Sequence, residues 1–218
     1  MLKIGVLVSG SGSNLQSIID KIEQGGLSAQ ISIVICNNPQ AFALERCAKH
    51  GIPTALMSHK DFPDRNDFDR KMAEILKGHG VELVVMAGFM RVLSPAFLQE
   101  FPMRVMNIHP ALLPSFPGLH GQKQAFDYGV KFSGCTVHFA DSGVDTGPII
   151  IQAIVPVFDD DTEDTLAARI LEQEHRIYPQ AIQFFAEGKL EVKGRKVIIK
   201  GHPRVGPAAI HNPPVTDF

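Results

Sequence analysis

Short apolar runs alternate with longer amphipathic stretches over the first half of this 218-residue chain. The runs are rich in valine, isoleucine and leucine without interruption, which is typical of strands buried on both faces. The alternation of strands with helices predicts an α/β, Rossmann-like fold, a mostly parallel twisted sheet with helices on both faces. The predicted strands are Lys3–Val8, Ile31–Cys36, Leu83–Gly88, Arg104–Ile108, Gly134–Phe139 and Ile149–Pro156.

Three of the amphipathic stretches predict helices with definable ends. The first has an apolar face over residues 15–22, and Ser13 or Asn14 would be its N-cap. The second and third cover Ala41–His50 and Asp64–His79, and a glycine follows each of them. These helices would separate the first three predicted strands, as a parallel sheet requires.

The second half of the chain has a different pattern. Beyond Phe132 the strands are joined by short loops, which predicts a mixed sheet on the C-terminal side. Thr162–Ala186 has the pattern of one long helix with Thr162 as its N-cap. Pro179 lies inside this helix and should kink or divide it.

The last part of the chain predicts a hairpin and then a tail. Leu190–Val192 and Lys196–Ile199 are the two short strands of the hairpin. Residues from about 201 to 218 contain four prolines among small residues and are expected to be loosely ordered. No linker divides the rest, so we expect a single domain over residues 1–218.

Composition excludes several classes of function. The 21 basic and 23 acidic residues give a formal net charge of −2 with no basic cluster, so binding to nucleic acid or to a membrane surface is not expected. No apolar run approaches the roughly 20 residues of a membrane span, and the first run is too short for a signal sequence. Cys36, Cys47 and Cys135 are scattered, which fits a reducing, cytoplasmic location.

The glycine-rich segment VSGSGSN joins the first strand to the first helix. Glycines allow a ligand to approach the backbone closely, and a helix N-terminus offers free N–H groups to an anion. We therefore expect Gly12, Ser13 and Asn14 to bind a phosphate monoester. The alternative is that these residues form only a tight turn and an N-cap.

The same segment does not match a dinucleotide fingerprint. Leu15 stands where the third glycine would be, and Asn37 and Asn38 stand where an acidic residue would bind a ribose. No Gly-Lys-Ser/Thr sequence follows, so the segment is not a Walker A loop either. A nicotinamide-dependent oxidoreductase is therefore disfavoured.

Asn107 and His109 lie two residues apart where a predicted strand ends, so their side chains share one face. An amide and an imidazole on one face are suitable donors for a developing oxyanion, and Pro110 stiffens the chain that presents them. A nearby carboxylate would hold the imidazole protonated, and Asp145 is the candidate. An Asx-turn residue is an equally good interpretation of Asp145 from spacing alone.

Other catalytic classes lack their motifs. There is no Gly-x-Ser-x-Gly elbow for a nucleophilic serine, and no paired His or Cys spacing for a metal. His79, His120 and His138 are isolated from one another in the sequence. The residues therefore predict direct attack by a substrate amine on a carbonyl, without a metal or a covalent intermediate, and leave donor and acceptor unnamed.

Six segments together resemble the phosphoribosylglycinamide formyltransferase family. The resemblance implies a formyltransferase fold and the transfer of a formyl group from the co-substrate 10-formyltetrahydrofolate to the amine of 5'-phosphoribosylglycinamide, in de novo purine biosynthesis. The segments are VSGSGSNLQ (8–16), MAGFMRVLSPAF (86–97), NIHPALLPSFPGLHG (107–121), TVHF (136–139), VDTGPIIIQ (144–152) and QEHRIYP (173–179).

The resemblance also implies roles for single residues. In its mechanism, protonated His109 and Asn107 stabilise the oxyanion, and Asp145 raises the pKa of His109. Glu174 would contact the ribose of the ribonucleotide, whose phosphate Gly12, Ser13 and Asn14 would hold. The residues implied to bind folate are Arg65, Met90, Arg91, Val92, Leu93, Asn107, Ala140, Asp141 and Val144.

Two other functions compete with this one. A formyltetrahydrofolate hydrolase is expected to have an additional N-terminal regulatory domain, and a methionyl-tRNA formyltransferase a basic C-terminal domain. A phosphate-binding α/β module without catalysis is the second alternative. The expected partners are small-molecule substrates, with the protein as a monomer or weak homodimer.

Overall fold

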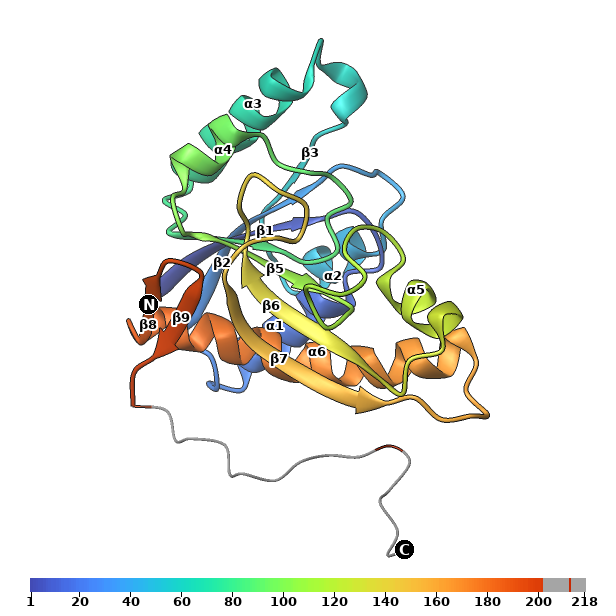
Figure 1. Cartoon of the computed structure of the whole chain (residues 1–218). Coiled ribbons are helices and arrows are strands. Elements are labelled where there is room, and N and C mark those ends of the chain that lie inside the picture. The colour runs from blue at the N-terminus through green and yellow to red at the C-terminus, as the bar shows by residue number, and fades with distance from the viewer. Residues whose placement is uncertain (202–211, 213–218) are drawn as a thin grey trace, which may run out of the picture.

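Nine strands form one continuous sheet in the computed structural model, which describes residues 1–201 and Asn212 (Figure 1). The predicted loose tail therefore falls almost entirely outside the described residues. The strands are β1 Leu2–Val8, β2 Ala29–Cys36, β3 Thr54–Leu56, β4 Leu83–Met86, β5 Val105–His109, β6 Phe132–Phe139, β7 Ile149–Pro156, β8 Leu190–Lys193 and β9 Lys196–Ile199.

The helices of the described chain include all those predicted and two short additional ones. The additional helices are α4, which has Ser94 as N-cap and Pro95 at its first position, and α5, which has neither signal. The helices are α1 Ser13–Glu23, α2 Ala43–Lys49, α3 Arg65–Gly78, α4 Pro95–Glu100, α5 Gly121–Tyr128 and α6 Glu163–Ala186, with a 3₁₀ turn at His59–Asp61.

The sheet is parallel on one side and mixed on the other, as predicted. Its order is β3-β2-β1-β4-β5-β6-β7-β9-β8. Strands β3 to β5 of this order are parallel, whereas β6 runs antiparallel to both β5 and β7. The chain leaves β1 in one direction for β2 and later returns on its other side for β4. This switch point is where ligands usually bind in open α/β sheets, beyond the carboxyl ends of the strands.

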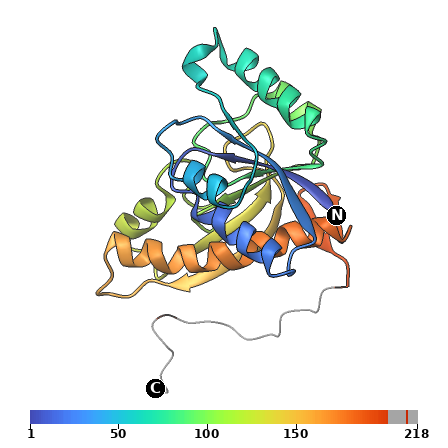
Figure 2. The same ribbon diagram turned by 180° about the vertical axis from the view of Figure 1, so that it is seen from behind.

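Helices cover both faces of the parallel part, which confirms the predicted layers (Figures 1 and 2). Alternate residues of each strand point to opposite faces. Val6 and Val85 therefore pack in the core cluster that contains the apolar faces of α1 and α6. Leu7 and Val84, their neighbours along the strands, pack instead with α3 and α4.

The start of α1 differs from the prediction. Its N-cap is Gly12, with a φ of 69° and no side-chain capping bond, rather than Ser13 or Asn14. The left-handed conformation at Gly12 turns the chain sharply into the helix, and a Cβ there would crowd Ala43. The polar side chains that follow are thereby left available for other contacts.

Helix α6 is not divided at Pro179, so that part of the prediction is wrong. The helix is continuous from Glu163 to Ala186, and Thr162 caps it in a reciprocal pair with Thr165. Pro179 removes one backbone donor, but it lies on the buried face of the helix. Tertiary packing of this face stabilises the helix across the missing bond.

Tyr178 joins α6 to the sheet near the ends of β4 and β5. Its side chain is fully buried, and its hydroxyl lies 3.0 Å from the carbonyl oxygens of both Met86 and Met106. Met86 is the last residue of β4, and Met106 precedes Asn107 in β5. The helix thus holds the two strands at the edge of the sheet where the predicted catalytic residues lie.

Replacing Tyr178 with Phe should lower the free energy of unfolding by about 1–2 kcal/mol, because buried strand carbonyls lose their donor. Equilibrium urea unfolding measures this change. Tyr128→Phe is the matched control: Tyr128 is 78% exposed, so its change should stay within about 0.5 kcal/mol. Equal stability of the two variants would contradict the role of the Tyr178 hydroxyl.

Candidate active site

Loops that follow β1, β4 and β5 meet at one edge of the sheet. The glycine loop after β1 is tied to the loop after β4 by two hydrogen bonds. The Ser9 N–H donates to the carbonyl oxygen of Gly88 at 3.1 Å, and the Met90 N–H donates to the Ser9 hydroxyl at 3.0 Å. The loop after β5 begins directly after His109.

The three predicted catalytic residues lie in contact with one another. Asn107 and His109 come from the end of β5, and Asp145 comes from the loop between β6 and β7. His109 Nδ1 lies 3.2 Å from Asp145 Oδ2, and the Asn107 side-chain amide donates to Asp145 Oδ1 at 3.2 Å. The Gly118 N–H donates to Oδ2 at 2.8 Å. The carboxylate therefore orients both candidate oxyanion donors.

His138 is a fourth member of this group that the sequence analysis did not identify. It pairs directly with Asn107 across β5 and β6, and its Nε2 lies 3.2 Å from the Asn107 amide nitrogen. Its Nδ1 lies 2.9 Å from the carbonyl oxygen of Phe139, which indicates that Nδ1 carries the proton. Nε2 then accepts from Asn107. Antiparallel pairing of the TVHF strand with β5 was the signal that could have identified it.

The backbone of Asp145 adopts a conformation that is uncommon for a residue other than glycine. Its φ is 54°, in the left-handed region. At Gly147 a Cβ would overlap the carbonyl group of Phe139, so the loop can pass close to the strand only with glycine there. Asp141, not Asp145, forms the Asx-type contact, accepting from the Gly143 N–H at 3.1 Å. The Asx-turn alternative for Asp145 is therefore not what the structure shows.

Opposing effects act on the pKa of His109. The side chain is 96% buried, and burial, the largest effect, lowers its pKa. The Asp145 carboxylate and the Phe116 carbonyl raise the pKa, but the net result lies below the ordinary value of 6.5. Burial thus opposes the expectation that the Asp145 carboxylate holds His109 protonated. The Asp145 carboxylate does raise the pKa of His109, as predicted, although burial has the larger effect.

The contacts of the His109 ring nevertheless suit a second proton. Nε2 lies 2.8 Å from the Phe116 carbonyl oxygen, and Nδ1 faces the Asp145 carboxylate. Both groups are acceptors, so only a doubly protonated ring can donate to both. Burial also raises the pKa of Asp145, yet the hydrogen bonds and charges around the carboxylate outweigh burial and leave that pKa below 3.8. Asp145 therefore stays ionised beside the ring.

The predicted phosphate loop borders a hollow of about 360 Å³. Ser13 lies on its wall together with residues of α1, and Arg46 and His175 bring cationic or proton-donating groups to it. The Nε2 atom of His175 is buried without a hydrogen-bond partner. These features provide space and donors for an anion beside the N-terminus of α1.

Asn14 and Glu174 are brought together although 160 residues separate them. The Asn14 amide donates to Glu174 Oε2 at 2.7 Å, and both side chains are buried. Burial raises the pKa of Glu174, and the Asn14 bond only partly offsets this effect. The residues predicted for the phosphate and for the ribose thus form one continuous surface.

The residues implied to bind folate lie in two loops and at the start of α3. Arg65 begins α3, with its Nε 3.9 Å from Asp69, and Asp69 accepts from the Ser94 N–H at 2.6 Å. In the loop after β4, Met90 and Val92 are exposed, Arg91 stacks over the Phe68 ring, and Leu93 is buried in the core.

The second loop carries Ala140, Asp141 and Val144. The Ala140 N–H donates to the Val105 carbonyl, Asp141 accepts from the Thr146 hydroxyl at 2.5 Å, and Val144 is exposed. Of these three residues, Val144 is exposed, whereas Ala140 and Asp141 are partly buried.

Thr136 and Gln152 support the loop after His109, and the sequence analysis missed both. The Thr136 hydroxyl donates to the Ala111 carbonyl at 2.7 Å and accepts from the Leu113 N–H at 3.1 Å. The Gln152 amide donates to the Leu113 carbonyl at 2.8 Å. Thr136 is the register partner of His109, so the strand pairing that places His138 also places this support.

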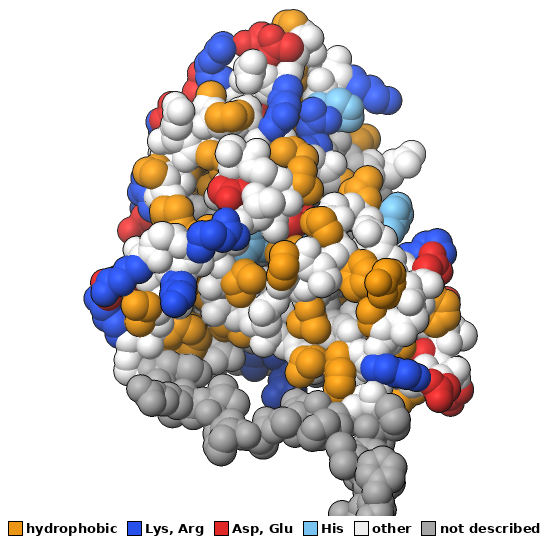
Figure 3. Space-filling view, viewed as in Figure 1, with side chains coloured by type: hydrophobic (Ala, Val, Ile, Leu, Met, Phe, Trp, Pro, Cys, Tyr) orange, Lys and Arg blue, Asp and Glu red, His pale blue; other side chains and the backbone are white. Residues whose placement is uncertain are grey.

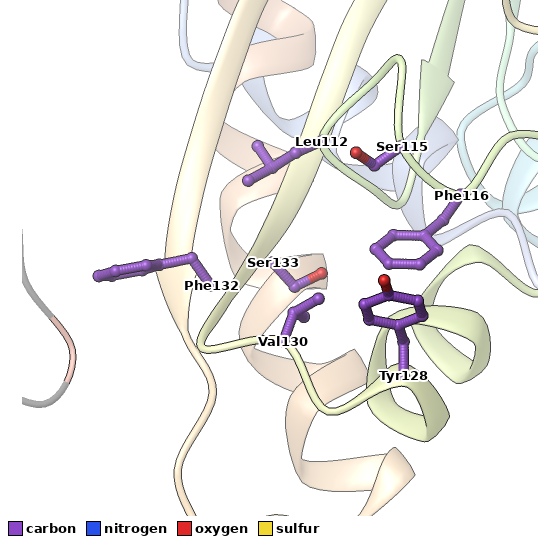
Figure 4. A pocket seen from close by; sticks show the side chains of 7 residues that line it. All are labelled: Leu112, Ser115, Phe116, Tyr128, Val130, Phe132 and Ser133. Carbon is purple, nitrogen blue, oxygen red and sulfur yellow. The ribbon is translucent and has the colours of Figure 1, made fainter.

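A separate hollow of about 400 Å³ lies on the other side of this loop (Figure 4). The rings of Phe116 and Tyr128 contact each other edge-on at its rim, with centroids 5.7 Å apart, and hydrophobic side chains gather over the surrounding β6, β7 and α5 (Figure 3). It contains none of the candidate residues, so we do not assign it to a substrate. Its lining residues are Leu112, Ser115, Phe116, Tyr128, Val130, Phe132 and Ser133.

The described residues lack two kinds of feature. Within them, no three or more His, Cys, Asp or Glu side chains are grouped so that they could hold a metal ion. No helix of the described chain has the length and apolar character needed to span a bilayer.

Known proteins resemble the chain over most of its length. The family model described as "Formyl transferase" matches residues 2–182. The phosphoribosylglycinamide formyltransferase of Escherichia coli (strain K12) is 44% identical over 88% of this chain and 90% of its own length. The crystal structure of glycinamide ribonucleotide transformylase 1 from Symbiobacterium toebii is 50% identical and has a TM-score of 0.90, covering 91% of this chain and 94% of the other.

A longer relative matches over only a small part of its own length. The trifunctional purine biosynthetic protein adenosine-3 of Drosophila melanogaster is 49% identical over 85% of this chain. The chain spans 14% of the length of that relative.

The contact between Asp145 and His109 predicts how the histidine titrates. Replacing Asp145 with Asn removes the charge that raises the pKa of His109, so this pKa should fall further below 6.5. NMR titration of the imidazole resonances measures it. Asp161→Asn, which breaks an ion pair with Arg169 far along the chain, should leave the pKa of His109 unchanged. An unchanged or higher pKa in Asp145→Asn would contradict the coupling.

Proposed function

Because the chain belongs to the formyl transferase family, we propose that it transfers the formyl group of 10-formyltetrahydrofolate to the amine of 5'-phosphoribosylglycinamide, a step of de novo purine biosynthesis. The observation that carries the proposal is the contact of Asn107, His109 and Asp145 at the edge of the sheet that also carries the phosphate loop. Direct acyl transfer needs donors for an oxyanion, a proton acceptor and a way to hold the second substrate. Asn107 would donate to the oxyanion, His109 would accept the proton, and the phosphate loop would hold the second substrate.

The ribonucleotide would bind across the start of α1 and the middle of α6. The N-terminus of α1, at Gly12 to Asn14, would receive the phosphate, since its free N–H groups point at an anion. Glu174 would accept from a ribose hydroxyl, because its second carboxylate oxygen is not used by Asn14. Folate would then occupy the loops after β4 and β6, which places its formyl group near β5.

In the proposed reaction the substrate amine attacks the formyl carbon, and a carbon–nitrogen bond forms. The formyl oxygen gains negative charge, and the Asn107 N–H that faces His138 Nε2 in the free protein turns to donate to it. His109, neutral before the attack, accepts a proton from the attacking nitrogen and becomes an imidazolium that Asp145 stabilises. The ring then returns the proton to the folate nitrogen as the bond from carbon to that nitrogen breaks. Products are the N-formyl ribonucleotide and tetrahydrofolate.

The turn at Phe116 has to move for this chemistry. His109 is only 3% exposed, and the Phe116 carbonyl occupies the side of Nε2. A substrate oxygen or nitrogen that reaches Nε2 would replace this carbonyl as its partner. Phe116 has a φ of 55°, a conformation of higher energy for a non-glycine residue, so leaving it costs little.

Several finer expectations stay predictions. The small-molecule substrates agree with the names of the relatives. The cytoplasmic location and the lack of nucleic-acid or membrane partners rest on sequence composition, and the state of monomer or weak homodimer stays an expectation. A formyltetrahydrofolate hydrolase and a non-catalytic phosphate-binding module remain the alternatives that experiment must separate.

An absorbance assay with both substrates tests the proposed reaction. Wild type should consume 10-formyltetrahydrofolate only when the ribonucleotide amine is present. Asp145→Asn should lower kcat at least about 100-fold, because the ring loses the group that stabilises its charged form. Tyr128→Phe, at an exposed position, is the control and should keep full activity.

The other outcomes of this assay are equally informative. Loss of the formyl donor without the amine would identify a hydrolase. Ribonucleotide binding by calorimetry with no turnover of either kind would leave only the binding module.

The pH profile tests the starting charge of His109. Since the neutral ring accepts the proton and its pKa lies below 6.5, kcat/KM should stay constant at neutral pH and fall as the pH drops through that pKa. In Asp145→Asn the residual activity should fall at a lower pH still. An acidic limb with its midpoint above 6.5 would overturn the neutral starting state.

A further inference from the structure

The C-terminal hairpin reaches the loop that carries Asp145. Strand β9 pairs in parallel with β7, with Lys196 opposite Ile149. This pairing brings the turn between β8 and β9 next to residues 146–149. There the Arg195 guanidinium donates from Nη2 to the Thr146 carbonyl oxygen at 2.7 Å, although 49 residues separate them.

We infer that Arg195 is a positioning residue: its hydrogen bond to the Thr146 carbonyl holds the backbone that presents the Asp145 carboxylate to His109. Thr146 directly follows Asp145, so the peptide group that Arg195 fixes is the next one along the chain. The inference rests on the proposed function, in which that carboxylate stabilises the charged ring. It assigns a role to the hairpin of β8 and β9, which contains none of the six segments that resemble the family.

The loop has few other external restraints on its backbone. Within it, Asp141 accepts from the Gly143 N–H and from the Thr146 hydroxyl. Among the described residues, Arg195 is the one side chain outside the loop that bonds to the backbone between Asp141 and Gly147. The conformation needs such a restraint, because Asp145 has a φ of 54° and would relax to a more common one if released.

The chemistry of arginine suits this task. Its guanidinium is planar, always charged and rich in donors, so one nitrogen can bond a carbonyl while the others remain hydrated. Lys193, the last residue of β8, instead pairs with Glu191 of its own hairpin at 3.0 Å. Arg195 and Lys193 thus form a matched pair of nearby cations with different partners.

The effect should appear in catalysis rather than in ribonucleotide binding. The sheet order places β9 beyond β7, whereas the phosphate loop follows β1, four strands from β7. A small displacement of a catalytic group can cost up to 100-fold in rate. We therefore expect Arg195→Ala to lower kcat roughly tenfold and to leave KM for the ribonucleotide within about twofold.

The experiment compares Arg195→Ala, Arg195→Lys and Lys193→Ala with wild type. Steady-state kinetics and NMR titration of His109 are measured for each, together with thermal unfolding. Arg195→Ala should show the loss of kcat and a lower pKa of His109, in the direction of Asp145→Asn. Arg195→Lys can still donate to the Thr146 carbonyl, so it should recover part of the lost kcat and part of the change in the pKa of His109. Lys193→Ala should match wild type in both quantities.

The readouts separate this inference from the proposed function. If wild type does not turn over the two substrates, the proposed function fails, and the His109 titration still tests the restraint. A pKa of His109 and a kcat equal to wild type in Arg195→Ala would overturn the inference. A loss shared equally by Lys193→Ala would also overturn it, since a general effect of hairpin charge would then explain the result.

Discussion

The Asp145 carboxylate is a negative charge largely shielded from water, and the site is arranged around it. An uncompensated charge in this position would cost several kcal/mol, so each of its oxygens needs partners. Oδ2 faces His109 and the Gly118 N–H, and Oδ1 faces Asn107 and His138. Those partners come from two strands and from the loop after β5. Removing the charge would therefore release the orientation of every candidate catalytic group at once.

Strand pairing supplies most of these partners. The antiparallel step from β5 to β6 places His138 opposite Asn107 and Thr136 opposite His109. One register thus sets both the polar cluster and the support of the loop that follows His109. From the other side of the sheet, Tyr178 holds the ends of β4 and β5, so α6 contributes to the site without entering it. The catalytic geometry is a consequence of the fold rather than an addition to it.

Much of this arrangement could be predicted from local sequence, and the exceptions have physical reasons. Strands, main helices and the glycine loop follow from periodicity, and the residues at the end of β5 follow from side-chain alternation. His138 was missed because its role depends on cross-strand register, which no local pattern encodes. The sequence analysis weighed only the carboxylate beside His109, whereas burial, a property of the folded chain, acts on the pKa of the ring in the opposite direction. Pro179 did not divide α6, since packing overrides local preference.

The contact between Asn14 and Glu174 has a consequence for synthesis of the protein. It joins the first helix to the last across 160 residues. At about 5–20 residues per second, a ribosome needs roughly 8–32 s to make the chain between them. During that interval the phosphate loop has left the ribosome without its partner carboxylate, and the surface that would hold the ribonucleotide is unfinished. A nascent chain can therefore acquire a complete binding surface only after α6 has been made and has packed against the sheet.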